Sequence, residues 1–206
     1  MARLLDAKCR QCRREGCKLF LKGEKCTTKK CPIERRPYVP GQHGQGRKRT
    51  TQYGTQLREK QKVKRAYGIL EKQFKAYYNE AERMKGVVGE NLLSLIERRL
   101  DNVVYRMGIG SSRNESRQIV NHGHITVNGH TVDIPSFSVK AGDVIEVKET
   151  KRDKEMFKAL KGMKVVMPKW LEFNPDTLSG KVLALPKRED VDMNISEHLI
   201  IELYSR

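Results

Sequence analysis

The five cysteines of this chain all lie within its first 31 residues. Cys9 and Cys12 form a Cys-x2-Cys pair, and Cys26 and Cys31 form a second close pair after 13 intervening residues. Two close pairs separated in this way allow four thiolates to meet around one tetrahedral ion. The spacing therefore predicts a metal site with these four ligands. Zinc is the expected metal, and an iron–sulfur cluster is the alternative, because four thiolates can hold either.

Disulfide bonds are the other use of paired cysteines. The amino terminus lacks an uninterrupted apolar core ahead of a small-residue cleavage site, so we expect a reducing compartment in which the thiols stay free. No segment approaches the 18 apolar residues of a membrane span. Cys17 is interpreted as a bystander of the metal site. The segment contains few apolar residues besides Leu19, Phe20 and Leu21, so metal binding is expected to supply its folding free energy.

The charge of the chain indicates what it could bind. Its 206 residues include 42 Lys and Arg against 25 Asp and Glu, a net charge of +17 with a pI near 9.8. Residues 1–66 hold 20 basic and 5 acidic side chains, so most of the excess lies in the first third. A membrane-surface protein would need an amphipathic helix with a bulky apolar face, which this third lacks. Nucleic acid is therefore the expected partner.

The middle of the chain changes from helical to strand periodicity at Gly123. Ser112 and Glu115 fit a capping box, which predicts a helix that begins at Ser112 and ends at Gly123. The pair Asn128-Gly129 predicts a two-residue type I′ turn between two short antiparallel strands. A second amphipathic helix is predicted just upstream. These elements are expected to form a small unit of two helices and a hairpin.

This small unit would hold five arginines and two histidines near one edge. Guanidinium groups match phosphate oxygens, although a solvated helical face is the alternative interpretation. Further basic residues lie in the arm and in the first long helix. The candidate RNA-binding residues of the whole chain are Arg13, Arg14, Arg35, Arg36, Arg47, Lys48, Arg49, Arg58, Lys60, Lys62, Lys64, Arg65, Arg98, Arg99, Arg106, Arg113, Arg117, His122 and His124.

Residues 32–54 contain three prolines and four glycines and show neither helical nor strand periodicity. A disordered linker is one interpretation of such a segment. Glycines also allow close backbone approach to phosphates, and a basic run follows at once, so ordering on RNA is the other interpretation.

Three helices are predicted between residues 56 and 97, with apolar residues at three-and-four spacing. They are expected to pack together and to present the basic face from Arg58 to Arg65 outward. Trp170 is expected to be a packing residue. The final segment HLIIELYSR is predicted to form a terminal strand, because its apolar residues alternate in two registers.

Several of these segments together resemble the bacterial small-subunit ribosomal protein S4 family. The resemblance covers nearly the whole chain and is carried by RLDNVVYR at 99–106, HGHITVNG at 122–129, PGQHG at 40–44, LREKQK at 57–62 and ELYS at 202–205.

The resemblance implies an α+β fold in which a helical domain contains an inserted RNA-binding module. The expected divisions are a metal-binding basic arm and loop (1–45), a helical domain that C-terminal residues complete (46–97), the S4-type module (98–160) and a C-terminal extension with a terminal strand (161–206). It also implies a cytoplasmic component of the small ribosomal subunit that binds a multi-helix junction of ribosomal RNA, nucleates assembly and contributes to decoding accuracy. Expected partners are neighbouring ribosomal proteins, and messenger RNA where it enters the subunit. Many members of this family lack the cysteines while others have four, so the metal site is compatible with the family but not required by it.

An enzyme is one rival class, since the family's RNA-binding module also occurs appended to RNA-modifying enzymes. A zinc-dependent regulator of duplex DNA is another. The sequence has no phosphate-binding glycine loop and no convincing nucleophile and base. Asp101, a tempting lone carboxylate, is expected to pair with neighbouring arginines. No recognition helix follows the cysteines. A binding protein without catalytic activity or a small-molecule substrate is therefore expected.

Overall fold

The computed structural model describes residues 4–46, 49–160, 162 and 166–205. The chain divides into two compact units. The first comprises Met1–Leu92 with Met193–Arg206, and the second comprises Leu93–Asp192. Residues 193–205 thus return to the unit formed by the first 92 residues of the chain.

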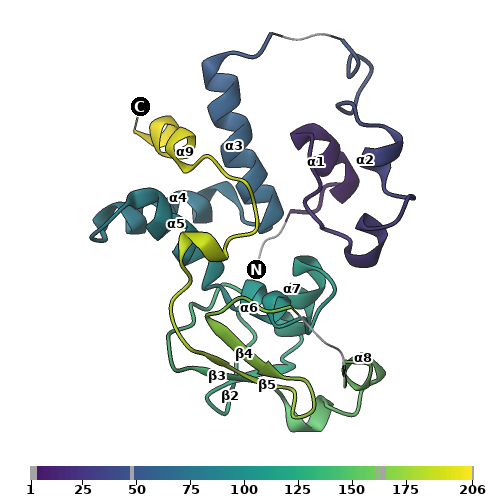
Figure 1. The fold of residues 1–206 in the computed structure, drawn as a ribbon, viewed down its shortest axis with the longest axis vertical. Coiled ribbons are helices and arrows are strands. Elements are labelled where there is room, and N and C mark those ends of the chain that lie inside the picture. Colours follow the sequence, from purple (N-terminus) through teal and green to yellow (C-terminus); the bar gives the residue numbers. More distant parts are fainter. Residues whose placement is uncertain (1–3, 47–48, 161, 163–165, 206) are drawn as a thin grey trace. The chain divides into compact units, whose positions relative to one another are not determined.

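The first unit is built from helices (Figure 1). They are α1 (Lys8–Glu15), the 3-10 turn η1 (Gly23–Cys26), α2 (Pro32–Arg35), α3 (Gln52–Ala66), α4 (Glu71–Arg83) and α9 (Glu197–Tyr204), while α5 (Val88–Glu97) continues into the second unit. Helix α3 begins after Thr51, whose hydroxyl accepts a hydrogen bond from the Gly54 amide at 3.1 Å. Val63, Phe74 and Ile200 are fully buried in this unit.

The prediction of a terminal strand is wrong, because residues 197–204 form α9. This helix packs along α3 (Figure 1). Ile200 is buried and Tyr204, four residues later, stacks on Tyr78 with 4.8 Å between ring centroids. An uninterrupted apolar run fits both periodicities, and here the contacts with α3 and α4 decide in favour of the helix.

The second unit contains a five-stranded antiparallel sheet in the order β2-β1-β3-β5-β4. Its elements are α6 (Leu100–Arg106), α7 (Arg113–Asn121), β1 (Ile125–Val127), β2 (His130–Thr131), β3 (Val144–Val147), η2 (Glu149–Lys151), α8 (Glu155–Lys158), β4 (Leu171–Asn174), β5 (Ser179–Val182) and η3 (Arg188–Asp190). The sheet extends past the expected module end at residue 160, because β5 pairs with β3.

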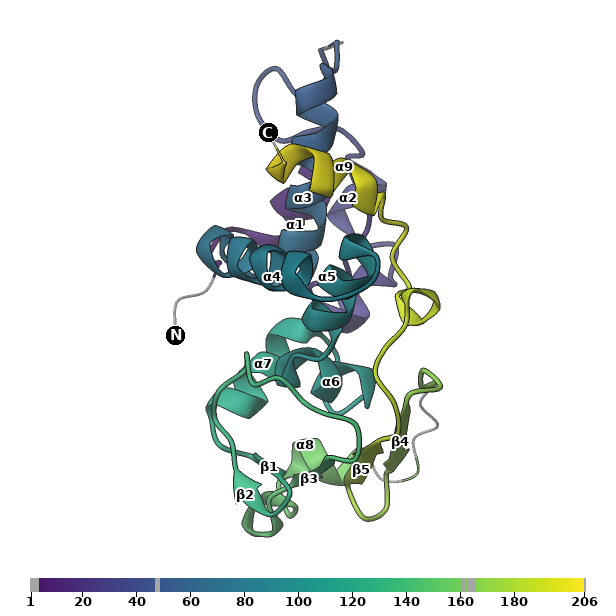
Figure 2. The same ribbon diagram turned by 90° about the vertical axis from the view of Figure 1, so that its left-hand side faces the viewer.

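Helices α6 and α7 cover one face of this sheet (Figures 1 and 2). Val104 and Met107 of the α6 region pack with Val120 of α7 and with sheet residues such as Ile145, and all four are fully buried. Trp170 is 3% exposed in the same core, so its predicted packing role is confirmed. This core holds α6 and α7 rigidly, with the basic residues they carry.

The predicted local signals of this unit are confirmed. The Ser112 hydroxyl accepts from the Glu115 amide at 3.3 Å, and α7 ends before Gly123, which has a left-handed φ of 64°. Asn128 and Gly129 both have positive φ, 51° and 81°, as a type I′ turn requires. The Glu115 carboxylate returns to the Ser111 amide at 2.8 Å instead of that of Ser112. In the described part of the chain, no helix is long and apolar enough to cross a membrane.

Candidate nucleic-acid interface

Asp101, in the first turn of α6, is shared by two arginines. Arg99 donates from Nε and Nη2 to its two carboxylate oxygens at 3.1 and 2.8 Å, and Arg117 of α7 donates from Nη1 at 3.1 Å. Arg99, Asp101 and Arg117 are 1%, 4% and 8% exposed. A buried carboxylate paired with two guanidinium groups joins α6 to α7. The predicted structural role of Asp101 is confirmed, and the two arginines that were candidate RNA ligands are engaged inside the unit.

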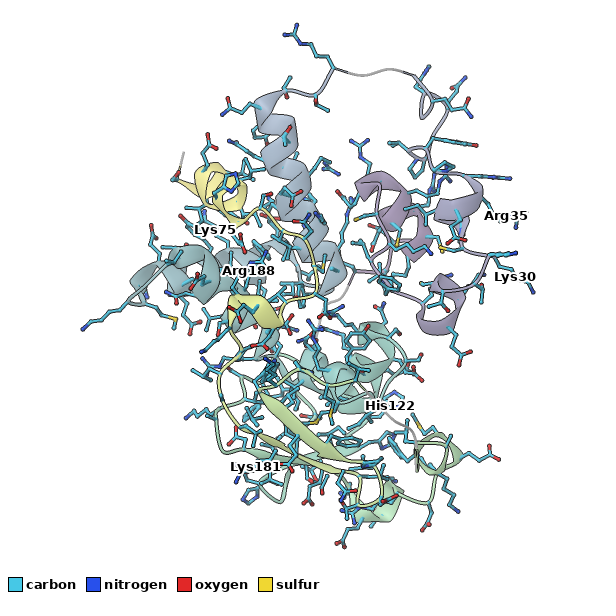
Figure 3. All side chains as sticks on the ribbon, viewed as in Figure 1. Lys30, Arg35, Lys75, His122, Lys181 and Arg188 are labelled. Carbon is cyan, nitrogen blue, oxygen red and sulfur yellow. The ribbon has the colours of Figure 1, made fainter. Side chains whose placement is uncertain are left out.

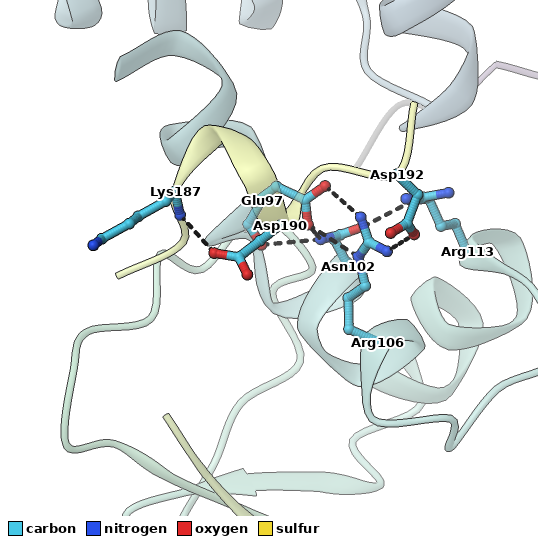
Figure 4. A network of polar contacts seen from close by, with 7 residues as sticks. All are labelled: Glu97, Asn102, Arg106, Arg113, Lys187, Asp190 and Asp192. Carbon is cyan, nitrogen blue, oxygen red and sulfur yellow. Dashed lines mark hydrogen bonds and ion pairs between the residues drawn. The ribbon is translucent and has the colours of Figure 1, made fainter. Parts of the chain in front are cut away.

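Arg106 belongs to a second buried network (Figure 4). It donates to both carboxylate oxygens of Glu97, at 2.9 and 3.2 Å, and also pairs with Asp192. The Asn102 amide donates to the Glu97 carboxylate at 2.5 Å, and its carbonyl oxygen accepts from Arg113 Nε at 2.8 Å. The network connects the end of α5, α6, the first residue of α7 and the residues after η3.

The remaining module arginines are nearer the surface. Arg98 is half-buried and donates from Nε to the Val139 carbonyl at 3.0 Å. Arg113 is also half-buried, and its guanidinium lies 4.6 Å from the centroid of the Tyr105 ring.

The two histidines that precede β1, His122 and His124, lie close together. Their rings are 5.8 Å apart, and His122 is exposed whereas His124 is 6% exposed (Figure 3 labels His122). Both line a cavity of about 250 Å³ together with Gln118 and Lys154. Burial, helped by Lys154, His122 and Lys151, lowers the pKa of His124. A neutral imidazole is therefore favoured in the free protein.

The basic face of α3 is not presented outward as expected. Arg58 and Arg65 both pair with Glu15, while Lys60 and Lys64 both pair with Glu71. Lys62 pairs with Glu59 and donates to the Asn194 carbonyl at 2.6 Å. The side chains of these five cations are between 11% and 32% exposed. Carboxylates of α1, α3 and α4 thus pair with the basic side chains of α3, which helical spacing alone predicted to face solvent.

Glu71 illustrates the strength of this pairing. Burial alone would raise its pKa, but hydrogen bonds from Lys60, Tyr204 and Lys64 lower the pKa of Glu71 to about 2. The Tyr204 hydroxyl donates to Glu71 at 2.8 Å, so α9 takes part in the same cluster.

The exposed arginines among the candidate RNA-binding residues all lie within the first 49 residues. Arg14, Arg35, Arg36 and Arg49 are exposed, and Figure 3 shows Arg35 pointing away from the rest of its unit. Arg13 instead donates from Nε to the carbonyls of Arg36 and Tyr38, both at 3.0 Å, and thereby fixes the loop after α2. Arg47 and Lys48 lie outside the described residues.

Sequence reasoning missed several accessible cations, namely Arg10, Lys29, Lys30 and Lys154. Figure 3 shows Lys30 projecting from the same side of the arm as Arg35. The Lys29-Lys30 pair directly before Cys31 and the helical spacing from Arg10 to Arg14 were available signals.

The four predicted ligand cysteines line one small cavity of about 10 Å³, and Cys17 is not among its lining residues. Helix α1 places Cys9 and Cys12 three residues apart on one face, and Cys31 caps α2 ahead of Pro32. The Lys22 amide donates to Cys26 Sγ at 3.4 Å. The cavity has room for about one atom-sized occupant. Thiolates are donors that zinc prefers, so the residue types agree with the predicted site, which stays a prediction. All five cysteines are free, and within the described residues no group of three or more metal-ligating side chains has a geometry that could hold an ion.

Two family models match consecutive segments of this chain. Residues 3–97 match the family described as the ribosomal protein S4/S9 N-terminal domain, and residues 98–145 match the S4 domain. The chain is 63% identical over 207 residues to the small ribosomal subunit protein uS4 of Clostridioides difficile (strain 630) and 61% identical over 209 residues to that of Ruminiclostridium cellulolyticum. Each alignment covers 100% of both chains. The chain therefore belongs to the uS4 family of small ribosomal subunit proteins.

Proposed function

We propose that this chain is a structural component of the small ribosomal subunit in the cytoplasm, where it binds ribosomal RNA and carries out no catalytic reaction. The observation that carries the proposal is the 63% identity, over the full length of both chains, to a small-subunit uS4 protein. Buried arginine–carboxylate pairs that hold the S4 domain rigid also support it. Its partners are the ribosomal RNA and neighbouring small-subunit proteins.

The mechanism is electrostatic binding of a folded polyanion. Exposed arm cations such as Lys30, Arg35 and Arg36 have no carboxylate within ion-pair distance among the described residues. Their association with phosphates releases counterions, so the affinity falls steeply as salt rises. Contacts to the RNA backbone and 2′-hydroxyl groups provide selectivity for shape, since side chains do not reach into the deep groove of an RNA duplex.

We further propose that the target is a junction where several RNA helices meet. The charge density of phosphates is highest at such a place, and two rigid basic units can contact different helices of one junction. Binding there would fix the junction early in assembly. A contribution to decoding accuracy and contact with messenger RNA where it enters the subunit are further parts of the proposal, based on resemblance to the family.

We also propose that Cys9, Cys12, Cys26 and Cys31 bind zinc, with an iron–sulfur cluster as the alternative. Support comes from the single cavity that these four residues line and from the Lys22 amide directed at Cys26. A bound ion would stabilise the segment between α1 and α2, which has few apolar residues to hold it.

The experiment compares the affinities of the full-length protein for a folded ribosomal RNA junction, duplex DNA and random-sequence RNA at one fixed salt concentration. Specific binding predicts a preference of about 1,000-fold or more for the junction. Equal affinities for the three nucleic acids would reject the proposal in favour of a general polyanion binder.

A further inference from the structure

A cavity of about 400 Å³ lies beside α1 within the first unit. Its lining residues include Asp6, Arg10, Gln11, Arg14, Pro40 and Arg65. Arg14 lies on the same face of α1 as Gln11 and Arg10, because it follows them by three and four residues. This volume lies in the usual range for small-ligand sites, about 300–1,000 Å³.

The cavity is positively charged. Arg10 and Arg14 are exposed, and neither has a carboxylate within 4 Å among the described residues. Arg65 also lines the cavity, while pairing with Glu15. Asp6 is the one carboxylate among the lining residues, so three guanidinium groups exceed the opposing charge. The ligand that suits this surplus carries phosphate.

Gln11 supplies the second observation. The residue is 4% exposed, and neither its amide nitrogen nor its amide oxygen has a hydrogen-bond partner within the described part of the chain. A buried amide without partners is costly unless a ligand satisfies it. An amide presents one donor and one acceptor side by side, which matches the edge of an unpaired nucleobase.

We propose that this cavity binds one unstacked ribonucleotide of the RNA partner. The base edge pairs with the Gln11 amide, Pro40 contacts the face of the base, and Arg10 and Arg14 bind the adjoining phosphates. A nucleotide within a duplex cannot enter, because its pairing edge and faces are covered. The inference rests on the proposed RNA-binding function and adds a site outside the S4 domain.

The test uses the full-length protein bound to small-subunit ribosomal RNA, with each unpaired base probed by an edge-specific modifying reagent. The variant is Gln11→Met, which keeps the side-chain volume and removes both hydrogen-bonding groups. Its matched control is Gln56→Met, since Gln56 is likewise fully buried with an unpartnered amide but does not line this cavity.

The expected result is that one unpaired base is protected in the wild-type complex, and that Gln11→Met restores its reactivity and lowers affinity about 10-fold, as for the loss of one base contact. Gln56→Met should leave protection unchanged. Should Gln11→Met fail to fold, the exposed Arg10→Gln variant replaces it, with Arg83→Gln as control. Arg10→Gln should expose the same base and reduce the salt slope by about one.

The outcomes separate this inference from the proposed function. If the wild-type protein does not bind the RNA, the proposed function fails. If it binds but no base protection depends on Gln11 or Arg10, the nucleotide site is rejected. If Arg10→Gln weakens binding while no base is protected, the cavity holds a phosphate only, which also overturns the proposal.

Discussion

Arg106 donates to both carboxylate oxygens of Glu97, from Nη2 at 2.9 Å and from Nε at 3.2 Å. Arg106 is 8% exposed and Glu97 is fully buried. The pair joins α6 to the end of α5, and the Asn102 amide adds a hydrogen bond to the same carboxylate. An arginine in this setting serves the rigidity of the unit that carries the other basic residues.

Replacing Arg106 by Met should therefore act on stability. The change leaves Glu97 buried without its charge partner, which costs about 3–5 kcal/mol. Urea unfolding monitored on the second unit would measure this loss. Replacing Arg106 and Glu97 together by Met and Gln should recover part of the stability, whereas equal losses in the single and double variants would contradict the pairing argument.

The exposed arm should determine the salt dependence of RNA binding. Replacing Arg35 and Arg36 by Gln removes two unpaired cations, so the slope of log affinity against log salt should fall by about two. Stability should change by less than about 0.5 kcal/mol, since both side chains are exposed. The control is the double variant Lys72→Gln and Lys75→Gln. Both lysines are exposed on α4 and lie outside the arm. An unchanged slope in the arm variant would remove Arg35 and Arg36 from the interface.

The Glu71 cluster should make the first unit sensitive to acid. The pKa of Glu71 is lowered to about 2 from the ordinary value of 4.5, so its ionised form stabilises the fold above pH 4.5 and this contribution is lost as pH falls toward 2. Glu71→Gln should therefore lower the thermal midpoint at about pH 6, and the difference from wild type should shrink at about pH 3. Glu80→Gln, on the exposed part of α4, is the control. A difference that does not vary with pH would contradict this assignment.

The cysteine cavity predicts which thiols matter for metal binding. Cys12→Ser should abolish stoichiometric metal in elemental analysis of the purified protein, whereas Cys17→Ser should retain it, because Cys17 does not line the cavity. Chelation should disorder residues 1–35 in amide spectra and leave the later body folded. If chelation leaves the arm amide signals unchanged, the metal does not supply its folding free energy.

Local structure in the second unit was predictable because its signals are contained within a few residues. Ser112 caps α7 through a hydroxyl three residues from its partner, and Asn128-Gly129 adopts the positive φ values that its residue types allow. The terminal helix was not predictable from its own residues. The apolar run at 199–201 fits either periodicity. Whether it forms a helix or a strand depends on contacts with Tyr78 and α3, which lie more than 100 residues earlier in the chain.

The candidate site shows the same limit. Spacing correctly located basic residues on α6 and α7, but it could not show that Arg99 and Arg117 share Asp101, or that Arg106 meets Asp192, 86 residues later. Which cations remain available to RNA depends on such long-range pairing. The available ones, including Arg10, lie mainly where no carboxylate from another element approaches.

The measurement that tests the central claim most directly is a nuclease footprint of the full-length protein on intact small-subunit ribosomal RNA, titrated in the presence of excess unstructured RNA. Our account predicts that one region where several helices meet is protected at the lowest protein concentrations while the rest of the RNA stays accessible. Uniform weak protection, abolished by the unstructured competitor, would contradict it.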